Sequence, residues 1–392
     1  MFAARTNWDL APTRLAAALE ARRAAGLPVL DLTESNPTRC ALAPDAEFIL
    51  DLLAQPASLR YDPAPMGLPP ARAAVAAYYA AKGVAVGADR VCLTASTSEA
   101  YAFLFRLLAD PGDDILVPRP SYPLLDFLAG LNDVRLVPYA LLDEGGRWRI
   151  DLERLRDGIG PRARAIVAVS PNNPTGSFVR SDERDALVAL CRAHGLVLIA
   201  DEVFADYPFE PAGDRVPSLA GTGSALTFVL SGLSKVVALP QMKLAWIAAS
   251  GPDEVVRGAL GRLEVIADTY LSVATPIQQA LPALLAGRAE IQGRILARLR
   301  ANRKTLWEAL TPGGPVEALP AEGGWYAVLR FPGLRDEEAW AVGLLERDGV
   351  HVHPGYLFDF AEPGYIVVSL LPGKEAFSEG INRLIARAGA DR

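Results

Sequence analysis

Short apolar runs alternate with segments of helical spacing through the first two thirds of the chain. The apolar runs lie at 91–94, 115–117, 134–138, 165–169, 196–200, 226–230 and 245–249, with helical segments at 99–108, 123–131 and 182–194. Unbroken apolar runs are typical of strands buried on both faces, and their alternation with helices favours a mostly parallel sheet. The pattern therefore predicts an α/β domain in which helices cover a central sheet.

The pattern changes in the rest of the chain. Helical stretches at 253–269 and 276–310, the second interrupted by Pro282 and Gly287, precede two extended stretches around 325–331 and 365–371, with helices at 336–347 and 374–388. Near the N-terminus, helices are expected at 14–25 and 70–82, and a short strand at 29–33. We expect residues 46–285 to form a large domain, and residues 1–45 with 286–392 a smaller α+β domain.

The bulk composition excludes several classes of protein. The 392 residues are 51% hydrophobic and 22% charged, which is ordinary for a globular chain with substantial cores. The net charge of −7 and the dispersed Lys and Arg residues argue against a nucleic-acid partner. Three Cys at wide spacing indicate neither disulfides nor a zinc site, and only three His leave little from which to build a metal cluster. No secretion signal or membrane-length apolar run occurs, so we expect no membrane association and a cytoplasmic location.

Lys235 is the most informative residue of the chain. It ends the segment Ser231-Gly232-Leu233-Ser234-Lys235, which directly follows an apolar run at 225–230. A lysine at the end of a buried strand is poorly solvated, which lowers the pKa of its amine and makes it a usable nucleophile. An isolated lysine of this kind is more often a surface residue whose stem packs on apolar neighbours, so the rest of the pattern must decide.

Three other polar segments also follow apolar runs. Asn173 lies in Ser170-Pro171-Asn172-Asn173-Pro174-Thr175-Gly176, Asp201 follows the run at 196–200, and Ser96, Thr97 and Ser98 follow the run at 91–94. In an open α/β sheet, ligands bind at the carboxyl ends of the strands. An amide, a carboxylate, a hydroxyl-rich turn and a lysine are thus expected to meet at one edge of the sheet.

The order and spacing of these segments resemble the fold-type I pyridoxal-phosphate enzymes, specifically the class I/II aminotransferase family. The resemblance runs from about Asp31 to the C-terminal helix, and it rests on Asn-Asn-Pro-Thr-Gly, on Asp-Glu-Val, and on Ser-Lys followed by Leu239-Pro240. It implies a fold-type I transferase fold, pyridoxal 5'-phosphate as the cofactor, and a homodimer.

The resemblance also implies the roles of three catalytic residues. Lys235 would form a Schiff base with the cofactor and then move the proton at the substrate Cα. Asp201 would keep the pyridine nitrogen of the cofactor protonated, although an Asp after a strand is also a common helix cap. Tyr122 would stack on the pyridine ring, and its ordinary interpretation is a core aromatic at a strand end.

Further residues are implied as ligands of the cofactor. Asn173 would bind its O3′ atom and also contact the substrate. A helix N-terminus rich in small polar residues is a suitable anion site, so Ser96, Thr97 and Ser98 would hold the phosphate, although such clusters often only cap helices. Ser231, Ser234 and Lys243 would complete the phosphate site. Tyr61 would reach the phosphate of the neighbouring subunit, so that the two active sites of a homodimer are shared.

Three positions depart from the family pattern. Phe204 stands where a tyrosine usually reaches O3′, so the Schiff base should keep its proton to higher pH. Lys243 stands where arginine is usual, and the loss of a bidentate contact predicts weaker cofactor retention. Val367 stands where an arginine usually binds the substrate carboxylate. Asn36 and Tyr326, with Asn173, are the candidates for substrate binding.

The function that this pattern predicts is that of an aminotransferase, which moves an amino group from an amino acid or related amine to a 2-oxo acid. The same residues support an alternative, a pyridoxal-phosphate-dependent carbon–sulfur or β-lyase or a decarboxylase. A third interpretation is a binding or regulatory protein of this fold that has lost catalysis. The intact Lys235, Asp201 and Asn173 argue against the third.

Overall fold

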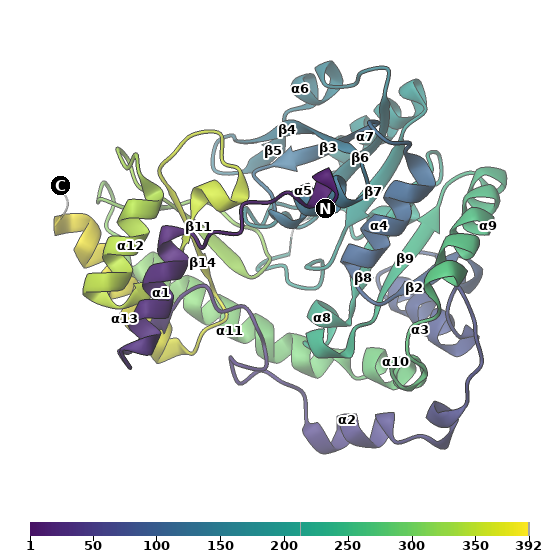
Figure 1. The fold of residues 1–392 in the computed structure, drawn as a ribbon, viewed down its shortest axis with the longest axis horizontal. Coiled ribbons are helices and arrows are strands. Elements are labelled where there is room, and N and C mark those ends of the chain that lie inside the picture. The colour runs from purple at the N-terminus through teal and green to yellow at the C-terminus, as the bar shows by residue number, and fades with distance from the viewer. Residues whose placement is uncertain (212, 391–392) are drawn as a thin grey trace.

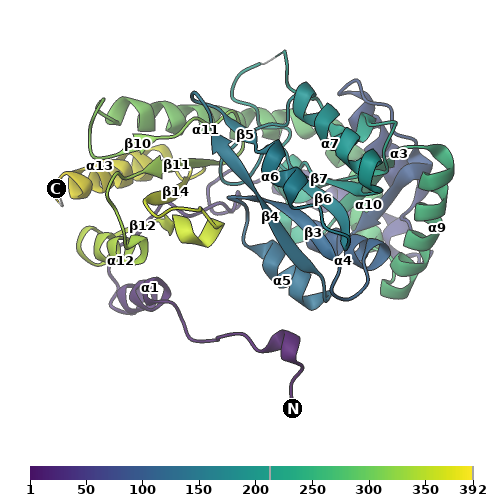
Figure 2. The ribbon, with the colours of Figure 1, turned by 90° about the horizontal axis from the view of Figure 1, so that it is seen from above.

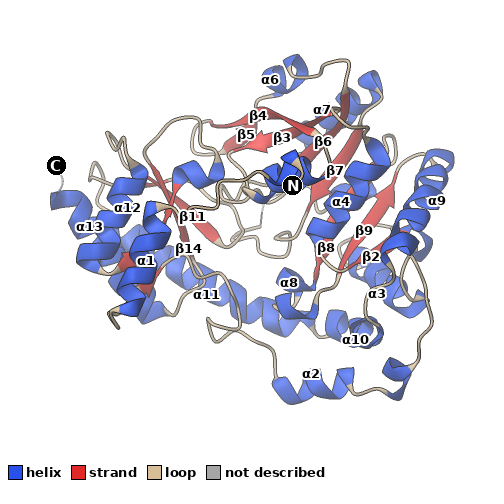
Figure 3. Cartoon of the chain, viewed as in Figure 1, coloured by secondary structure: helices blue, strands red, loops and turns tan. Residues whose placement is uncertain are grey.

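The large sheet that the apolar runs predict is present in the computed structural model, which describes residues 1–211 and 213–390 (Figures 1 and 3). Its eight strands lie in the order β2-β9-β8-β7-β6-β3-β4-β5. Their bounds are β2 Val91–Thr94, β3 Asp114–Arg119, β4 Arg135–Asp143, β5 Trp148–Ile150, β6 Ala163–Val169, β7 Val197–Asp201, β8 Thr227–Gly232 and β9 Ala245–Ser250.

The centre of this sheet is parallel. Strands β8, β7, β6, β3 and β4 run in one direction, whereas β9 pairs antiparallel with β8 and β2, and β5 pairs antiparallel with β4. Successive residues of β6 enter opposite cores, Ile166 and Ala168 on one face and Ala165 and Val167 on the other. Burial on both faces explains why these strands read as unbroken apolar runs, and the predicted fold class is confirmed.

Helices cover both faces of the sheet. One core includes side chains from α4 (Thr97–Leu108), α5 (Leu124–Leu131) and α9 (Asp253–Tyr270). The other includes side chains from α3 (Pro69–Ala80), α6 (Leu152–Asp157), α7 (Ser181–His194) and α10 (Thr275–Ala286). The short helix α2 (Ala46–Leu53) contributes Ile49 to this second core and lies below α8 (Leu233–Val236) and α10 in Figure 1.

The C-terminal part forms a smaller sheet with its own helices beside the large sheet. Its four-stranded sheet has the order β10-β11-β14-β13, and β1 pairs parallel with β12. These elements are β1 Leu30–Asp31, β10 Glu317–Ala318, β11 Tyr326–Arg330, β12 Val350–His351, β13 His353–Pro354 and β14 Tyr365–Ser369, with helices α1 Arg14–Ala24, α11 Arg288–Ala309, α12 Glu337–Asp348 and α13 Lys374–Ala390. In Figure 2 the N-terminal residues run from α1 toward α5.

The N-terminal segment packs against elements of the C-terminal part. Leu30 pairs with Val350, and α1 packs against α12. The division into residues 46–285 and residues 1–45 with 286–392 stays a prediction. Within the described residues, no helix has both the length and the apolar character that crossing a bilayer requires.

One expected helix break is wrong. The break at Gly287 is confirmed, since α10 ends at Ala286 and α11 begins at Arg288, but Pro282 lies inside α10. Proline in a helix removes a backbone hydrogen bond. Here the neighbouring Leu281 and Leu284 are buried in the core, so tertiary packing outweighs the local cost.

Candidate active site

A cavity of about 310 Å³ opens at the carboxyl ends of the central strands. Val169 ends β6, Asp201 ends β7 and Gly232 ends β8, and all three line it. Most of the predicted site residues line the same cavity: Ser96, Thr97, Ser98, Tyr122, Asn173, Asp201, Phe204, Ser234, Lys235, Lys243 and Tyr326. Parallel strands deliver their ends to one edge, so residues far apart in sequence meet there.

Lys235 enters the cavity from α8, directly after β8. A side chain at Gly232 would lie 2.8 Å from Cβ of Ala245 and 3.0 Å from the carbonyl oxygen of Leu244, so glycine lets β8 approach this backbone closely. The Lys235 Nζ lies 4.5 Å from the ring centroid of Trp325. Burial lowers the pKa of the Lys235 amine to about 8, although the charge of Asp201 acts in the opposite direction.

Asp201 is held in place by two hydrogen bonds. The backbone N–H of Val203 donates to its Oδ1 at 3.1 Å, and the hydroxyl of Tyr101 donates to its Oδ2 at 3.1 Å. Burial raises the pKa of the Asp201 carboxyl to about 6, while these hydrogen bonds and Lys235 lower it in part. Tyr101 also lines the cavity and was not predicted. Its one available signal was its place on the helix that Ser96, Thr97 and Ser98 begin.

The two adjacent asparagines have different surroundings. The Asn172 Oδ1 accepts a hydrogen bond from the Thr175 hydroxyl at 3.0 Å, which closes the turn. Asn173 lines the cavity and is 7% exposed, and its Oδ1 has no hydrogen-bond partner within the protein. A buried amide oxygen without a partner is costly, which marks Asn173 as a group with hydrogen-bonding capacity for a ligand.

The hydroxyl-rich turn forms the N-terminus of α4. The Ser96 Oγ accepts from the backbone N–H of Glu99 at 3.1 Å, so the capping interpretation is correct for this side chain. The Glu99 carboxylate in turn accepts a hydrogen bond from the backbone N–H of Ala95 at 2.6 Å. Thr97 and Ser98 line the cavity in the first turn of this helix, where backbone N–H groups and the helix dipole favour an anion.

An apolar wall faces these polar groups. Leu124, Leu125 and Leu128 of α5 line the cavity next to Tyr122, which is half exposed. The backbone N–H of Ser121 donates to the carbonyl oxygen of Phe358 at 2.9 Å, which ties this wall to the C-terminal part. The leucines were not predicted, because a helix following a strand gives no signal of which face meets a ligand.

Three predicted residues do not line the cavity. Ser231 is buried next to it, and its hydroxyl has no hydrogen-bond partner within the protein. Asn36 accepts from the Thr38 hydroxyl at 2.8 Å, while its neighbour Ser35 lines the cavity and hydrogen-bonds Tyr326. Tyr61 is 78% exposed. Their roles in binding stay predictions.

No arginine is among the cavity-lining residues in the described part of the chain, and the cations that line it are Lys235 and Lys243. Val367 is fully buried in β14, where it pairs with Val328 of β11 and His353 of β13. Arg119, close to Tyr122 in sequence, is paired instead with Asp126 at 3.6 Å and with Asp359 at 3.5 Å.

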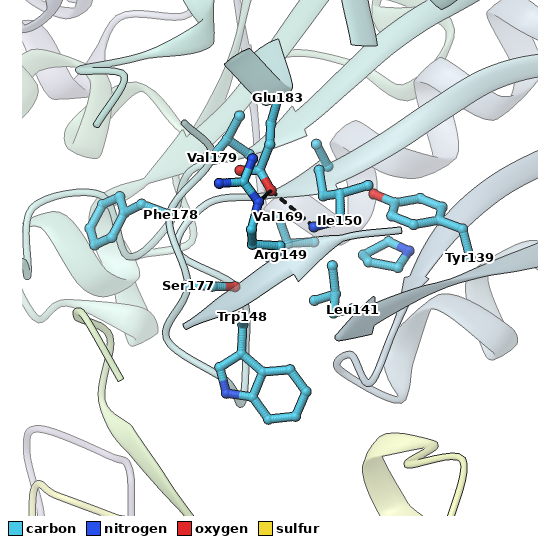
Figure 4. Close-up of a pocket in the computed structure, with 12 residues that line it drawn as sticks. Tyr139, Leu141, Trp148, Arg149, Ile150, Val169, Ser177, Phe178, Val179 and Glu183 are labelled. Atoms are coloured by element: carbon cyan, nitrogen blue, oxygen red, sulfur yellow. Dashed lines mark hydrogen bonds and ion pairs between the residues drawn. The ribbon is translucent and has the colours of Figure 1, made fainter. Parts of the chain in front are cut away.

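A second cavity near β4 and β5 has a volume of only about 10 Å³, which is the size of one water molecule (Figure 4). Glu183 lines it and accepts two backbone hydrogen bonds. Its Oε1 accepts from the N–H of Ile150 and its Oε2 from the N–H of Arg180, both at 2.9 Å. This place is structural, and a ligand of substrate size fits the larger cavity.

This sheet order, with its ligand cavity at the carboxyl strand ends and a lysine after β8, defines the fold-type I transferase class. A model of the family "Aminotransferase class I and II" matches residues 30–376. The chain therefore belongs to the class I and II aminotransferases and is a transaminase.

Characterised relatives agree with this assignment. The chain is 28% identical to the glutamate-pyruvate aminotransferase AlaA of Escherichia coli K12, over 88% of this chain and 87% of that protein. It is 30% identical to the alanine aminotransferase of Mycobacterium tuberculosis, over 94% and 87%. Among solved structures, a Thermus thermophilus aspartate aminotransferase mutant superposes with a TM-score of 0.84 at 26% identity, over 99% of both chains.

Proposed function

We propose that the protein is a pyridoxal-phosphate-dependent aminotransferase that moves an amino group from an amino acid or related amine to a 2-oxo acid, with Lys235 as the covalent ligand of the cofactor. The observation that carries the proposal is the Lys235 amine, whose pKa is lowered to about 8 inside a cavity that also contains Asp201. At pH 7 about one tenth of an amine of that pKa is unprotonated, roughly 300 times the fraction of an ordinary lysine, and this form can attack a carbonyl carbon.

The residues present fit pyridoxal phosphate. The N-terminus of α4 supplies backbone N–H groups for a phosphate, and Ser234 and Lys243 line the same cavity. Asn173 lines the cavity with no protein partner at its Oδ1, and its amide NH2 is the group that would donate to O3′ of the cofactor. The fixed carboxylate of Asp201 suits a pyridine nitrogen. When bound, the cofactor supplies an aldehyde that exchanges amines and a ring that accepts the electrons released at the substrate Cα.

The side chains of this chain divide the remaining work. The Lys235 amine removes the proton at the substrate Cα and delivers it to the C4′ atom of the cofactor. A pKa near 8 allows the amine both to accept and to release this proton. The Asp201 charge, fixed by Val203 and Tyr101, stabilises positive charge beside it. Leu124, Leu125 and Leu128 exclude water from one side of the cavity.

The substrates are proposed from the relatives and from the cavity. Relatives include a glutamate-pyruvate and an arginine-pyruvate aminotransferase, so we take pyruvate as the first 2-oxo acid to test. Because no arginine of the described residues lines the cavity, the substrate carboxylate would be bound by hydroxyl and amide groups such as those of Ser35, Tyr326 and Asn173.

A homodimer with shared active sites is part of the proposal. Tyr61 is 78% exposed, and Leu59 two residues earlier is 92% exposed. Large apolar side chains with this exposure are suited to contact with a second copy of the chain. Tyr61 would then reach the phosphate of the other subunit.

The function is tested by mixing the purified yellow protein with a panel of amino acids and amines. Loss of the absorbance of the lysine-bound cofactor, with formation of the aminated cofactor and a 2-oxo acid, is the expected result. Pyruvate with ammonia would instead establish the lyase alternative, and a spectrum that no donor changes would overturn the proposal.

The Phe204→Tyr variant should alter the pH titration of the lysine-bound cofactor. Phe204 is 4% exposed, lines the cavity and lies 5.4 Å from the Trp325 ring centroid, so an added hydroxyl could donate to the cofactor oxygen. Such a hydrogen bond favours the unprotonated form, and we expect the midpoint to fall by about one pH unit. Absorbance titration measures it, with the exposed Phe127→Tyr as control. An unchanged midpoint would show that position 204 does not tune the cofactor.

A further inference from the structure

The backbone around Lys235 is held by two side chains from distant parts of the chain. The hydroxyl of Tyr207 donates a hydrogen bond to the carbonyl oxygen of Lys235. The Nε2 of Gln292, on α11, donates to the carbonyl oxygen of Val236 at 3.0 Å. Helix α8 has only four residues, too few to be stable alone, so external contacts must determine where it lies.

Asp206 fixes one of these donors. Its Oδ2 accepts from Gln292 Nε2 at 3.0 Å and from the Tyr78 hydroxyl at 2.9 Å, and its Oδ1 pairs with the Lys82 ammonium at 2.7 Å. The Lys82 and Asp206 side chains are only 18% and 8% exposed. With both protons of its Nε2 donated, Gln292 has a single orientation, and the ion pair holds it there.

Tyr207 also acts on the other end of the Lys235 side chain. Its ring packs edge-on against Trp325 at 5.3 Å, and Trp325 is the ring that lies 4.5 Å from Lys235 Nζ. One residue therefore contacts both the backbone of Lys235 and the aromatic neighbour of its amine. Tyr207 lies six residues after Asp201, so the end of β7 and the segment directly after it supply both the acid and this contact.

We propose that Tyr207 and Gln292, the latter anchored by Asp206, are positioning residues that set the place of the Lys235 amine relative to Asp201. The reason this matters for catalysis rests on the proposed function, because the amine must reach both the cofactor and the substrate Cα. Small displacements of a reacting group are expensive in rate, and these two donors bind the carbonyl oxygen of Lys235 itself and that of the next residue.

The variants Tyr207→Phe and Gln292→Leu each remove the donor with little change in volume. The matched control is Tyr79→Phe, since Tyr79 is equally buried and its hydroxyl accepts from Trp246 Nε1 at 3.1 Å, away from α8. In the full-length protein without cofactor, the modification of Lys235 by an amine-reactive reagent is followed against pH by peptide mapping. The charged group facing this amine is Asp201, and the rings of Phe204 and Trp325 lie beside it.

We expect the modification midpoint of both variants to rise by about half to one pH unit, toward that of a solvated lysine, because the amine becomes better hydrated. In the loaded enzyme, kcat should fall roughly tenfold with KM within about twofold, as for a lost positioning contact. The control should match the parent in both measurements.

A merely structural role gives a different result. If Tyr207→Phe and Gln292→Leu lower the melting temperature as Tyr79→Phe does, but leave the Lys235 midpoint and kcat unchanged, the proposal is wrong. Either variant alone decides the matter should the other fail to fold. A midpoint shift in a protein that never binds pyridoxal phosphate would uphold the positioning role and overturn the proposed function instead.

Discussion

Replacing Lys235 with methionine is expected to abolish covalent capture of pyridoxal phosphate and to slow amino transfer by about 10³-fold or more. Methionine keeps the length and fills the buried space, but it provides neither a nucleophile nor a proton carrier. Borohydride reduction with peptide mapping should label residue 235 in the parent and nothing in Lys235→Met. The matched control is Lys243→Met, the other cation that lines the cavity, which should keep the label but retain the cofactor less well.

The same variant should stabilise the protein without cofactor. The pKa of Lys235 falls from 10.5 to about 8 on folding, so the folded state disfavours the ammonium form. This cost is fully present below pH 8, decreases between pH 8 and 10.5 and is absent above. Lys235→Met should therefore raise the free energy of unfolding by roughly 2 kcal/mol at pH 7 and by little at pH 10.5. Urea denaturation at the two pH values measures the difference, and equal gains at both would contradict this explanation.

The strand ends could be predicted from the sequence because parallel strands impose a common edge. The apolar run at 91–94 coincides with β2, and Asp201 and Lys235 come at or just after the ends of their strands, as expected. Lys235, Asp201, Asn173 and the turn at 96–98 then meet in one cavity. Local pattern suffices for such residues, since strand direction determines their place.

Contacts between distant segments could not be predicted in this way. Tyr101 donates to Asp201 across 100 positions of sequence, and Gln292 reaches Val236 from α11. The apolar run at 29–33 forms a strand only at Leu30–Asp31, because its partner β12 is equally short. Near Asn36, the residue that lines the cavity is its neighbour Ser35. Such details depend on tertiary packing, which leaves no periodic signal in the chain.

Burial of Lys235 and Asp201 costs stability and supplies chemistry at the same time. Both pKa shifts are caused mainly by loss of water, and each is reduced by the charge of the other residue. A cavity that kept these groups solvated would return the pKa of the Lys235 amine toward 10.5 and leave a far smaller fraction of it unprotonated at neutral pH, and it would screen the charge of Asp201. We therefore expect substitutions that remove either charge to raise the free energy of unfolding and to lower the rate of amino transfer.

Asp201→Asn is the sharpest test of that exchange. Asparagine keeps one oxygen, which can accept from the Val203 N–H, and its NH2 group can donate to the Tyr101 hydroxyl, but it removes the negative charge that would hold a proton on the pyridine nitrogen. We expect the rate of amino transfer to fall by about 10²-fold or more, because charge stabilisation in a water-poor site is a large term. Single-turnover absorbance kinetics with the best amino donor measures the loss.

The neighbouring Glu202 provides the matched control for this variant. Glu202 does not line the cavity, accepts from the Ser218 hydroxyl and the Leu219 N–H at 2.6 Å each, and has a pKa raised by burial to about 7. The pKa of Asp201 rises from 3.8 to about 6 on folding, so its cost is absent below pH 3.8 and complete above pH 6. Both Asp201→Asn and Glu202→Gln should thus stabilise the cofactor-free protein at pH 8, by roughly 1–2 kcal/mol each. Only Asp201→Asn should slow amino transfer. If the rate of Asp201→Asn stays within twofold of the parent, this carboxylate does not act on the cofactor.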